Sequence, residues 1–443
     1  MKQIGTKYKY AVRKSLIELD DGSKKEIFVI PLVDTETGLW VKLTDYADLM
    51  LYKCDEDASA FKADKSSLHF VCAFLNYLFD NELVSTPLEI TKEMAQDYLD
   101  YYSQTYDKRG RYPAKATVKR VRDAITVFLE MLAFNRGEKM LHIRYGDLSS
   151  SHYVINSDHK SIPRPVYTLK IHPIHNGTGG LQQLERDMPL GIVSRLEEMA
   201  RIHDPEIEFA IVLMAFMGLR EGSVCNVRRK SSAYGPGIID TVQKIECAGG
   251  IERKCLGFMV DLKREYLMRS DKVDVGNIKR EREQIAFASF KDHIYEAYER
   301  HLSLIASKPC EASMPMFLLK KKSKNGKYMA LTAKELRKRI MDIMYKYVLP
   351  SCKDDPDIDM QIFYHQMTVN KKTWGPHALR HWFTVMLVLY GCDQPTIMTM
   401  RGDSSPLSAM MYLERKAVFQ KMYEKSLDKM MLKYTGGIND VET

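Results

Sequence analysis

The chain has 443 residues, of which 45% are hydrophobic and 28% are charged, and its formal net charge is +8. This composition is typical of a globular protein with two or three domains, and it excludes global disorder. The longest apolar run, residues 209–219, is too short to span a bilayer, so we expect no membrane partner. The modest basic excess leaves nucleic-acid binding open, because its effect depends on where the charges gather.

The eight cysteines do not predict a metal site. No two of them stand at C-x-x-C spacing, and no Cys/His cluster has zinc-finger spacing. In a long chain with few cysteines, this pattern favours free thiols in a reducing compartment.

The first half of the chain predicts two different kinds of structure. Residues 1–60 indicate a small β-containing module, with a strand at 25–33 and a hairpin turn at 20–23. Residues 61–136 indicate a helical domain, because apolar residues recur at helical spacing. The helices are expected at 67–83, 93–102 and, most clearly, 117–134.

A dense basic patch lies at the start of the last of these helices. It comprises Lys108, Arg109, Arg111, Lys115, Lys119, Arg120 and Arg122. Such a patch is either a solvated helix face or a surface that contacts phosphates, and the pattern alone leaves both readings open.

The second half begins after a stretch rich in turn residues. Residues 137–184 contain prolines, a serine run and a glycine-rich segment, and are typical of a linker. Residues 185–443 are expected to form one mainly helical domain with β-type runs between about 235 and 290. Its clearest features are helices at 189–200 and 207–219, a helix after the capping box of Thr332 and Glu335, and a final helix at 417–432.

Two segments of this domain carry residues suited to chemistry. The first, Met217-Gly218-Leu219-Arg220, ends an apolar helix in an arginine. The second contains His377-Ala378-Leu379-Arg380-His381, then Gly402-Asp403-Ser404-Ser405, then Tyr412. Arg380 follows His377 by three residues, Asp403 follows Arg380 by 23, and Tyr412 follows Asp403 by nine.

This ordered set resembles the tyrosine recombinase (phage integrase) family. That family has an arginine after Gly-Leu at a helix end, a His-x-x-Arg motif, a Gly-His pair and a downstream tyrosine. The likeness is specific over residues 374–415, moderate around Arg220 and only architectural before residue 185. It implies a mainly α fold with small β-sheet and hairpin elements (α+β), in which a helical core-binding domain at 61–136 precedes a catalytic domain at 185–443.

The residue types suit the breaking of a DNA phosphodiester. A positioned tyrosine phenol is a competent oxygen nucleophile, arginines grip anionic oxygens with forked geometry, and an imidazole moves a proton near neutral pH. By resemblance, Tyr412 is the nucleophile, Arg220 and Arg380 clamp the phosphate, and His377 is the general base or proton shuttle. His381 is expected to be structural. This chemistry needs no metal and no other cofactor.

The family also has a hairpin lysine between the two arginine motifs, thought to protonate the leaving 5′-oxygen. Residues 271–283 resemble that hairpin, and Lys272 is the preferred candidate, ahead of Lys279 and Lys263.

Three departures from the family pattern bear on the site. Asp403 stands where the family usually has His or sometimes Trp, and an ionised carboxylate would repel phosphate. It is therefore protonated, or turns toward a basic neighbour or the tyrosine hydroxyl, or weakens cleavage. Ser223 replaces a frequent glutamate, and 157 residues separate Arg220 from His377, more than in compact members.

The resemblance implies a site-specific DNA recombinase that forms a 3′-phosphotyrosine during integration, excision or transposition of a mobile element. Its partners would be double-stranded DNA and a homotetramer on two duplexes, with or without an accessory protein, in the cytoplasm at the bacterial nucleoid. Two alternatives remain. One is a type IB topoisomerase or telomere resolvase, and the other is a non-catalytic DNA-binding relative.

Overall fold

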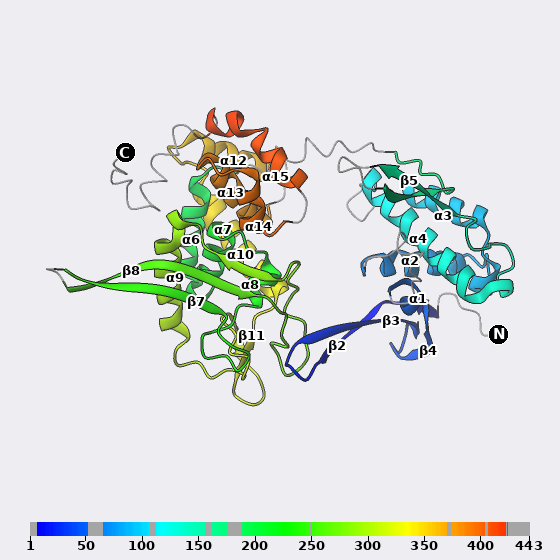
Figure 1. Cartoon of the computed structure of the whole chain (residues 1–443), viewed down its shortest axis with the longest axis horizontal. Helices are drawn as coiled ribbons and strands as arrows, with labels where there is room; N and C mark the ends of the chain where they lie inside the picture. The colour runs from blue at the N-terminus through cyan, green and yellow to red at the C-terminus, as the bar shows by residue number, and fades with distance from the viewer. Residues whose placement is uncertain are drawn as a thin grey trace. The chain divides into compact units, whose positions relative to one another are not determined.

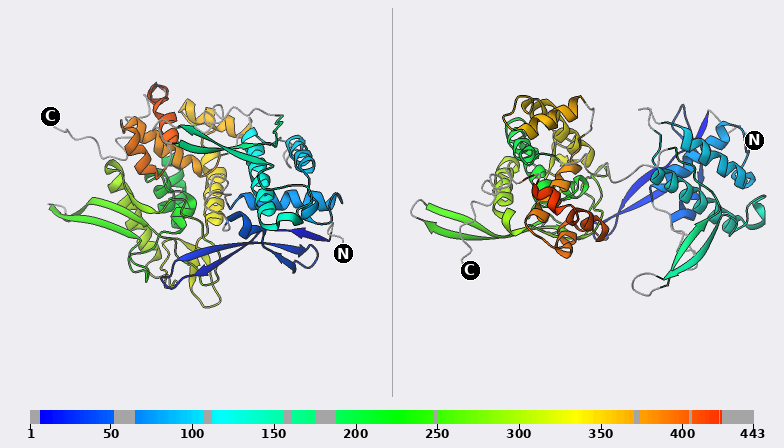
Figure 2. Two further views of the ribbon diagram at one scale, coloured as in Figure 1. Left: turned by 45° about the vertical axis from the view of Figure 1, so that its right-hand side comes forward. Right: turned by 90° about the horizontal axis from the view of Figure 1, so that it is seen from above.

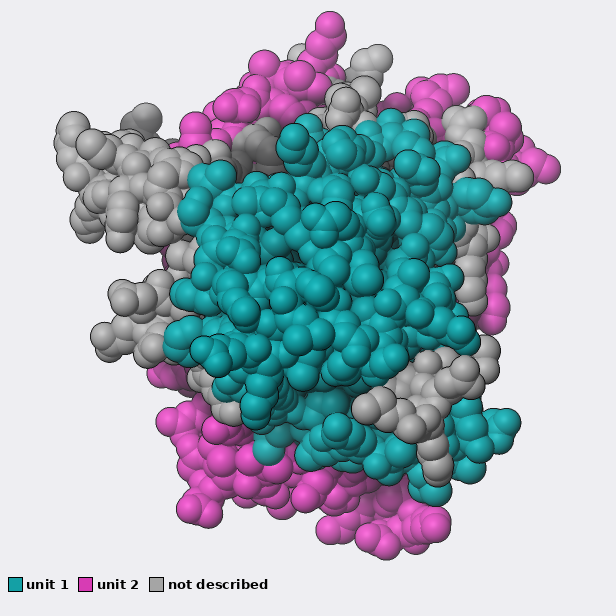
Figure 3. Space-filling view, turned by 90° about the vertical axis from the view of Figure 1, so that its right-hand side faces the viewer, with its two compact units in different colours: residues 1–15, 26–179 teal, residues 16–25, 180–443 magenta. Residues whose placement is uncertain are grey.

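The computed structural model is mainly helical, with small antiparallel sheets, which confirms the predicted fold class (Figure 1). It describes residues 7–51, 65–106, 112–155, 161–174, 188–247, 250–369, 374–403, 406–421 and 423. The chain divides into two compact units (Figure 3). Unit 1 comprises residues 1–15 and 26–179, and unit 2 comprises residues 16–25 and 180–443. No helix in the described ranges is long and apolar enough to cross a membrane.

The N-terminal sheet is built around one long strand, β3 (Lys24–Asp34). It pairs with β1 (Tyr8–Tyr10), β2 (Arg13–Glu18) and β4 (Trp40–Thr44). The predicted strand at 25–33 is confirmed as β3, and the predicted turn at 20–23 joins it to β2. The middle of β3 is buried, as the apolar run Phe28 to Val33 requires.

Three helices form the core of unit 1, and all three were predicted from apolar spacing. The helices of this unit are α1 (Tyr46–Leu51), α2 (Ser67–Asp80), η2 (Pro87–Glu89), α3 (Lys92–Gln104), α4 (Lys115–Arg136) and η3 (Gly137–Lys139). The Thr91 hydroxyl caps α3 by accepting from the Met94 amide. The apolar face of α4, including Val121, Ile125 and Phe128, packs against α2, so these helices share one core.

Part of the stretch expected to be a linker is ordered within unit 1. Strands β5 (Ser149–Ile155) and β6 (Ser161–Tyr167) pair antiparallel. The reason lies in α4, where the buried Glu130 carboxylate accepts backbone N–H bonds from Gly146, Leu148 and Ser149 at 2.6–2.9 Å. A buried carboxylate needs such donors, so it fixes the base of the hairpin. The predicted start of the last domain, residue 185, lies outside the described residues.

Unit 2 is organised around α7 (Glu208–Phe216), whose nine residues are all buried. Helices α6, α9 and α13 pack against it. The helices of this unit are α6 (Gly191–His203), η4 (Pro205–Ile207), α7, α8 (Glu221–Cys225), η5 (Ala288–Phe290), α9 (Lys291–Ile305), α10 (Ala333–Ile343), the π-helical η6 (Met344–Val348), α11 (Leu349–Ser351), α12 (Ile358–Thr368), α13 (His377–Leu389), α14 (Gln394–Arg401) and α15 (Pro406–Leu413).

Two small antiparallel sheets complete unit 2. Strands β7 (Ile238–Cys247), β8 (Gly250–Leu262) and β9 (Arg282–Ile285) form one, and β7 and β8 extend from the unit as a long hairpin (Figure 2). Strands β10 (Leu318–Lys322) and β11 (Tyr328–Ala330) form the other and carry the lysine-rich turn between them.

The hairpin expected at 271–283 differs in the structure. β9 begins only at Arg282, and it pairs with β8, so residues 263–281 form a long irregular connection. Side chains hold this path in place of a strand ladder. The Asp274 carboxylate accepts the Gly276 amide at 3.0 Å and pairs with Lys24 at 2.9 Å. Local carboxylate-to-backbone bonds of this kind compete with strand pairing.

Candidate active site

A sharp turn after α7 brings the two predicted arginines together. Gly218 has φ +63°, and a Cβ at this position would lie 2.4 Å from the Phe383 ring of α13. Only glycine fits here, because other residues disfavour this conformation and any side chain would collide with the ring. The Gly218 carbonyl accepts from Nη1 of Arg380, two residues before Arg220. The Gly-Leu-Arg and His-x-x-Arg segments therefore meet directly.

Arg380 is a buried cation on α13, with 1% of its surface exposed. Its Nη2 donates to the Arg401 carbonyl at 2.7 Å and to the Asp403 carboxylate at 2.9 Å. Burial, together with the neighbouring Arg220, lowers the pKa of Arg380 to about 9. Its environment therefore disfavours the charged form and demands an anion close by.

The Asp403 carboxylate supplies that anion by bridging three guanidinium groups. Its oxygens lie 2.9 Å from Nη2 of Arg380, 3.4 Å from Nη2 of Arg220 and 2.6 Å from Nε of Arg401. Of the options left open by the sequence, the structure shows the carboxylate turned toward basic neighbours. The place where arginines would hold a phosphate is filled by a side chain of the protein itself.

Tyr412 on α15 belongs to the same cluster. Its hydroxyl lies 2.7 Å from Nδ1 of His381, and the Arg401 guanidinium lies 5.0 Å from the centre of its ring. His381 was expected to be structural, yet it makes the contact to the predicted nucleophile. His377 is the first residue of α13 and is exposed.

Lys272 is not brought to this cluster by any contact among the described residues. It is exposed in a turn with φ +58°, within the connection between β8 and β9. Ser223 is buried in α8, and the carboxylate partner of Arg220 is Asp403. Of the six predicted catalytic residues, the structure thus brings together Arg220, Arg380, Asp403 and Tyr412.

The predicted DNA-binding patch belongs to unit 1. Lys115, Lys119 and Arg120 are exposed at the start of α4, whereas Arg122 is half-buried, bonds Asp123 and lies 4.2 Å from the centre of the Tyr167 ring. Lys108, Arg109 and Arg111 lie outside the described residues, as do most of the predicted final helix, Ser404 and Ser405.

Three further arginines lie at the site and were not predicted. They are Arg401, Arg280, whose Nη1 donates to the Asp403 carbonyl at 2.7 Å, and Arg282, which packs on Gly402. The sequence signals were the basic run around the start of β9 and, for Arg401, its position directly before Gly402 and Asp403. A cleft of about 560 Å³ adjoins them, and Arg280, Arg282 and Asp403 are among the residues that line it.

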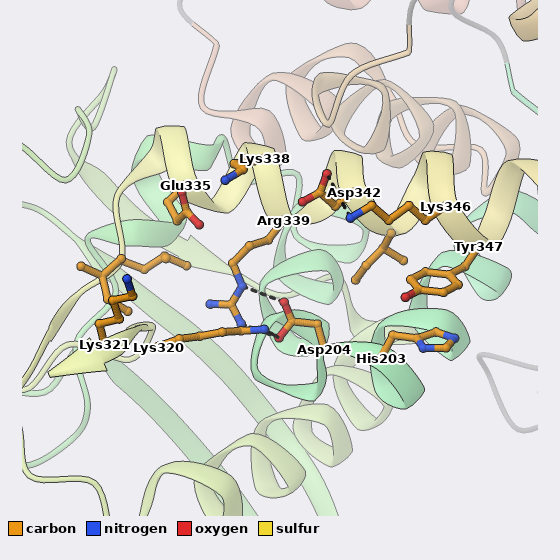
Figure 4. A pocket seen from close by; sticks show the side chains of 13 residues that line it. His203, Asp204, Lys320, Lys321, Glu335, Lys338, Arg339, Asp342, Lys346 and Tyr347 are labelled. Carbon is orange, nitrogen blue, oxygen red and sulfur yellow. Dashed lines mark hydrogen bonds and ion pairs between the residues drawn. The ribbon is translucent and has the colours of Figure 1, made fainter.

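A second cavity of unit 2, of about 540 Å³, lacks all the predicted site residues (Figure 4). Asp204 pairs there with two of the cations, at 2.8 Å from Nε of Arg339 and 3.2 Å from Nζ of Lys320. His203 stacks on Tyr347 with ring centres 3.6 Å apart. In the described part of the chain, no group of three or more His, Cys, Asp or Glu side chains is placed to hold a metal.

No protein-family model matches the chain, and no curated protein matches it. Among solved structures, the chain is similar to the XerH site-specific recombinase bound to a palindromic difH substrate, with 14% identity and a TM-score of 0.45 over 81% of this chain and 78% of that one. It is also similar to the Tn1549 transposon integrase in complex with circular intermediate DNA, with 15% identity and a TM-score of 0.40 over 79% and 90%. A third similar structure is a lambda integrase dimer bound to a core site, with 10% identity and a TM-score of 0.38 over 79% of this chain and 89% of that one.

Proposed function

We propose that this chain is a tyrosine-type site-specific DNA recombinase that cuts and rejoins strands during integration, excision or transposition of a mobile element. One observation carries the proposal. Arg220 and Arg380 converge with Arg401 on a single carboxylate, in a cluster that also contains Tyr412. Guanidinium groups bind carboxylates and phosphates with the same forked geometry, so this cluster suits the anionic oxygens of a phosphodiester.

In the cleavage step, the Tyr412 oxygen attacks the phosphorus and gives up its proton. Nδ1 of His381 is the proton acceptor that lies in hydrogen-bond range, at 2.7 Å. The bond from phosphorus to the 5′-oxygen breaks, and that oxygen takes up a proton to leave as a 5′-hydroxyl. Arg220 and Arg380 stabilise the charge that grows on the non-bridging oxygens. The product is a 3′-phosphotyrosine.

Rejoining is the same chemistry in reverse. A 5′-hydroxyl from another strand attacks the phosphotyrosine, and the tyrosine oxygen recovers its proton. One phosphoester bond is exchanged for another at each step, so the reaction requires no external energy source. The partners under this proposal are double-stranded DNA and three further copies of the chain, which together act on two duplexes.

A covalent trap tests the proposal. DNA fragments from both sides of the chain's own gene are incubated with purified protein after random single nicks have been introduced. A nick next to the cleavage position releases a short strand, so the covalent complex cannot be resealed. We expect a protein–DNA adduct with the wild type and none with Tyr412→Phe. No adduct with the wild type would contradict the enzyme proposal, and an adduct with Tyr412→Phe would contradict the choice of nucleophile.

The same preparation separates strand exchange from topoisomerase activity. A recombinase joins strands from two duplexes at the trapped site, whereas a type IB topoisomerase relaxes supercoiled plasmids that lack the site. Products that join two input duplexes are expected here. Relaxation without such products would favour the topoisomerase alternative.

A further inference from the structure

The candidate site holds more positive charge than the Asp403 carboxylate offsets. Five guanidinium groups, those of Arg220, Arg280, Arg282, Arg380 and Arg401, lie at or beside Asp403. These five cations outnumber the three carboxylates at the site and its cleft, those of Asp403, Glu281 and Glu283, and Glu283 also pairs with Lys263. Such an excess of cations favours the binding of a further anion.

Arg220, Arg380 and Arg401 contact the Asp403 carboxylate, whereas Arg282, like Arg280, donates to neutral groups. Within the described residues its hydrogen bonds run to neutral acceptors, the Gln284 side chain at 2.8 Å from Nε and the Arg280 carbonyl at 3.0 Å from Nη1. Gln284 is 1% exposed and is itself fixed, because its amide donates to the Met400 carbonyl at 2.7 Å. The guanidinium is therefore oriented by neutral groups.

The position of Arg282 depends on a missing side chain. Gly402 ends α14 with φ +62°, and a Cβ there would lie 2.5 Å from both Cζ and Nε of Arg282. The guanidinium thus lies against the backbone immediately before Asp403. Burial and the neighbouring Arg220 and Arg280 lower the pKa of Arg282 to about 10, and the Asp403 carboxylate offsets only part of that effect.

We propose that Arg282 is a third phosphate-binding residue, whose guanidinium contacts a non-bridging oxygen of the scissile phosphodiester together with Arg220 and Arg380. The inference rests on the proposed function and adds a residue to it. Under this proposal Asp403 occupies the oxyanion position in the structure, and Arg282 and Asp403 both line the same cleft. When a phosphate displaces the carboxylate, Arg282 is already held next to it.

The first test compares Arg282→Gln and Arg282→Lys with a matched control, Arg264→Gln. Arg264 lies in the same connection before β9, but it is exposed and pairs with Asp21. Single-turnover cleavage of the trapped site is measured with enzyme in excess. We expect Arg282→Gln to cleave about 10²-fold to 10³-fold more slowly, Arg282→Lys to recover part of that loss, and the control to stay near the wild-type rate.

A second substrate distinguishes phosphate contact from a structural role. A methylphosphonate at the scissile position lacks one anionic oxygen, so a residue that binds this oxygen matters less. The ratio of the wild-type cleavage rate to the Arg282→Gln cleavage rate should therefore be smaller on this substrate by about tenfold or more. An equal deficit on both substrates would overturn the proposal, and so would wild-type cleavage by Arg282→Gln. The wild-type adduct reports the proposed function separately, because it forms whether or not Arg282 contributes.

Discussion

Replacing Asp403 by asparagine removes one charge from the centre of the site and nearly preserves its shape. In the wild type this carboxylate, with 11% of its side chain exposed, contacts three arginines at 2.6–3.4 Å. The amide of Asp403→Asn can still accept one hydrogen bond, but it cannot offset the charge of Arg220, Arg380 and Arg401. The DNA-free variant is therefore left with three close cations and no anion.

The expected cost follows from that loss. Removing one partner of a buried ion pair lowers the free energy of unfolding by about 3–5 kcal/mol. Because the asparagine amide can still accept one hydrogen bond, we expect a loss of about 3 kcal/mol for Asp403→Asn. For a unit of this size, each kcal/mol lowers the Tm by roughly 2–4 °C, so a decrease of about 6–12 °C is expected. Inorganic sulfate or phosphate should restore much of it, because these anions fill the place of the carboxylate.

Thermal melting with and without sulfate measures the effect, and Asp261→Asn is the matched control. Asp261 pairs with the buried Arg228 at 2.8 Å, and neither residue belongs to the arginine cluster. The Tm of Asp261→Asn should also be lower than that of the wild type, but sulfate should raise it less than it raises the Tm of Asp403→Asn. An Asp403→Asn variant as stable as the wild type, or no more responsive to sulfate than the control, would refute the reasoning.

Cleavage provides a second readout of the same position. Because a phosphate need not displace a carboxylate in Asp403→Asn or Asp403→His, both variants should cleave at least as fast as the wild type at temperatures where they are folded. A loss of more than about tenfold, roughly 1.4 kcal/mol, would show that the carboxylate itself contributes to the reaction.

Three further predictions concern other parts of unit 2. Gly218→Ala should lower the free energy of unfolding by at least about 2 kcal/mol in urea melts, whereas Gly257→Ala, with open space around it, should stay within about 0.5 kcal/mol. His381→Gln should slow adduct formation by about 10²-fold and His377→Gln by less, and the reverse order would restore the assignment made from the sequence. Burial lowers the pKa of His301 to about 4, so the unfolded chain binds a proton before the folded one, and stability should fall by roughly 3 kcal/mol between pH 6.5 and 4. In His301→Gln this part of the pH dependence should disappear, and an unchanged profile would contradict it.

Regular elements were predictable where one periodicity dominated. Helices α2, α3 and α4 follow from apolar spacing, and β3 follows from its apolar run. Hydrogen bonds between side chains and the backbone leave no periodic pattern in the sequence, so their effects on the fold were not predictable. Glu130 orders a hairpin in the stretch expected to be a linker, and Asp274 replaces the expected hairpin by an irregular path. The first effect depends on residues that are distant in sequence, and the second depends on a local turn. Neither produces a periodic pattern of apolar residues.

The candidate site was predictable to the extent that it depends on spacing. Resemblance selected Arg220, Arg380, Asp403 and Tyr412, which the structure brings into one cluster. Contacts across the fold were not predictable in the same way. Arg282 reaches the site because Gly402 leaves room for it, and His381 reaches the tyrosine because α13 and α15 pack together.

The division of the chain into two units limits where a gene crossover could exchange one unit for another. Residues 16–25 belong to unit 2, although the residues on both sides of them belong to unit 1. Within unit 2, Lys24 is 2% exposed and binds Asp274 and the Gly276 carbonyl, in the connection that leads to Arg282. A gene crossover at residue 180 would therefore transfer unit 2 without residues 16–25, which belong to it. Inheritance of the two units as a pair is the outcome that this connectivity favours.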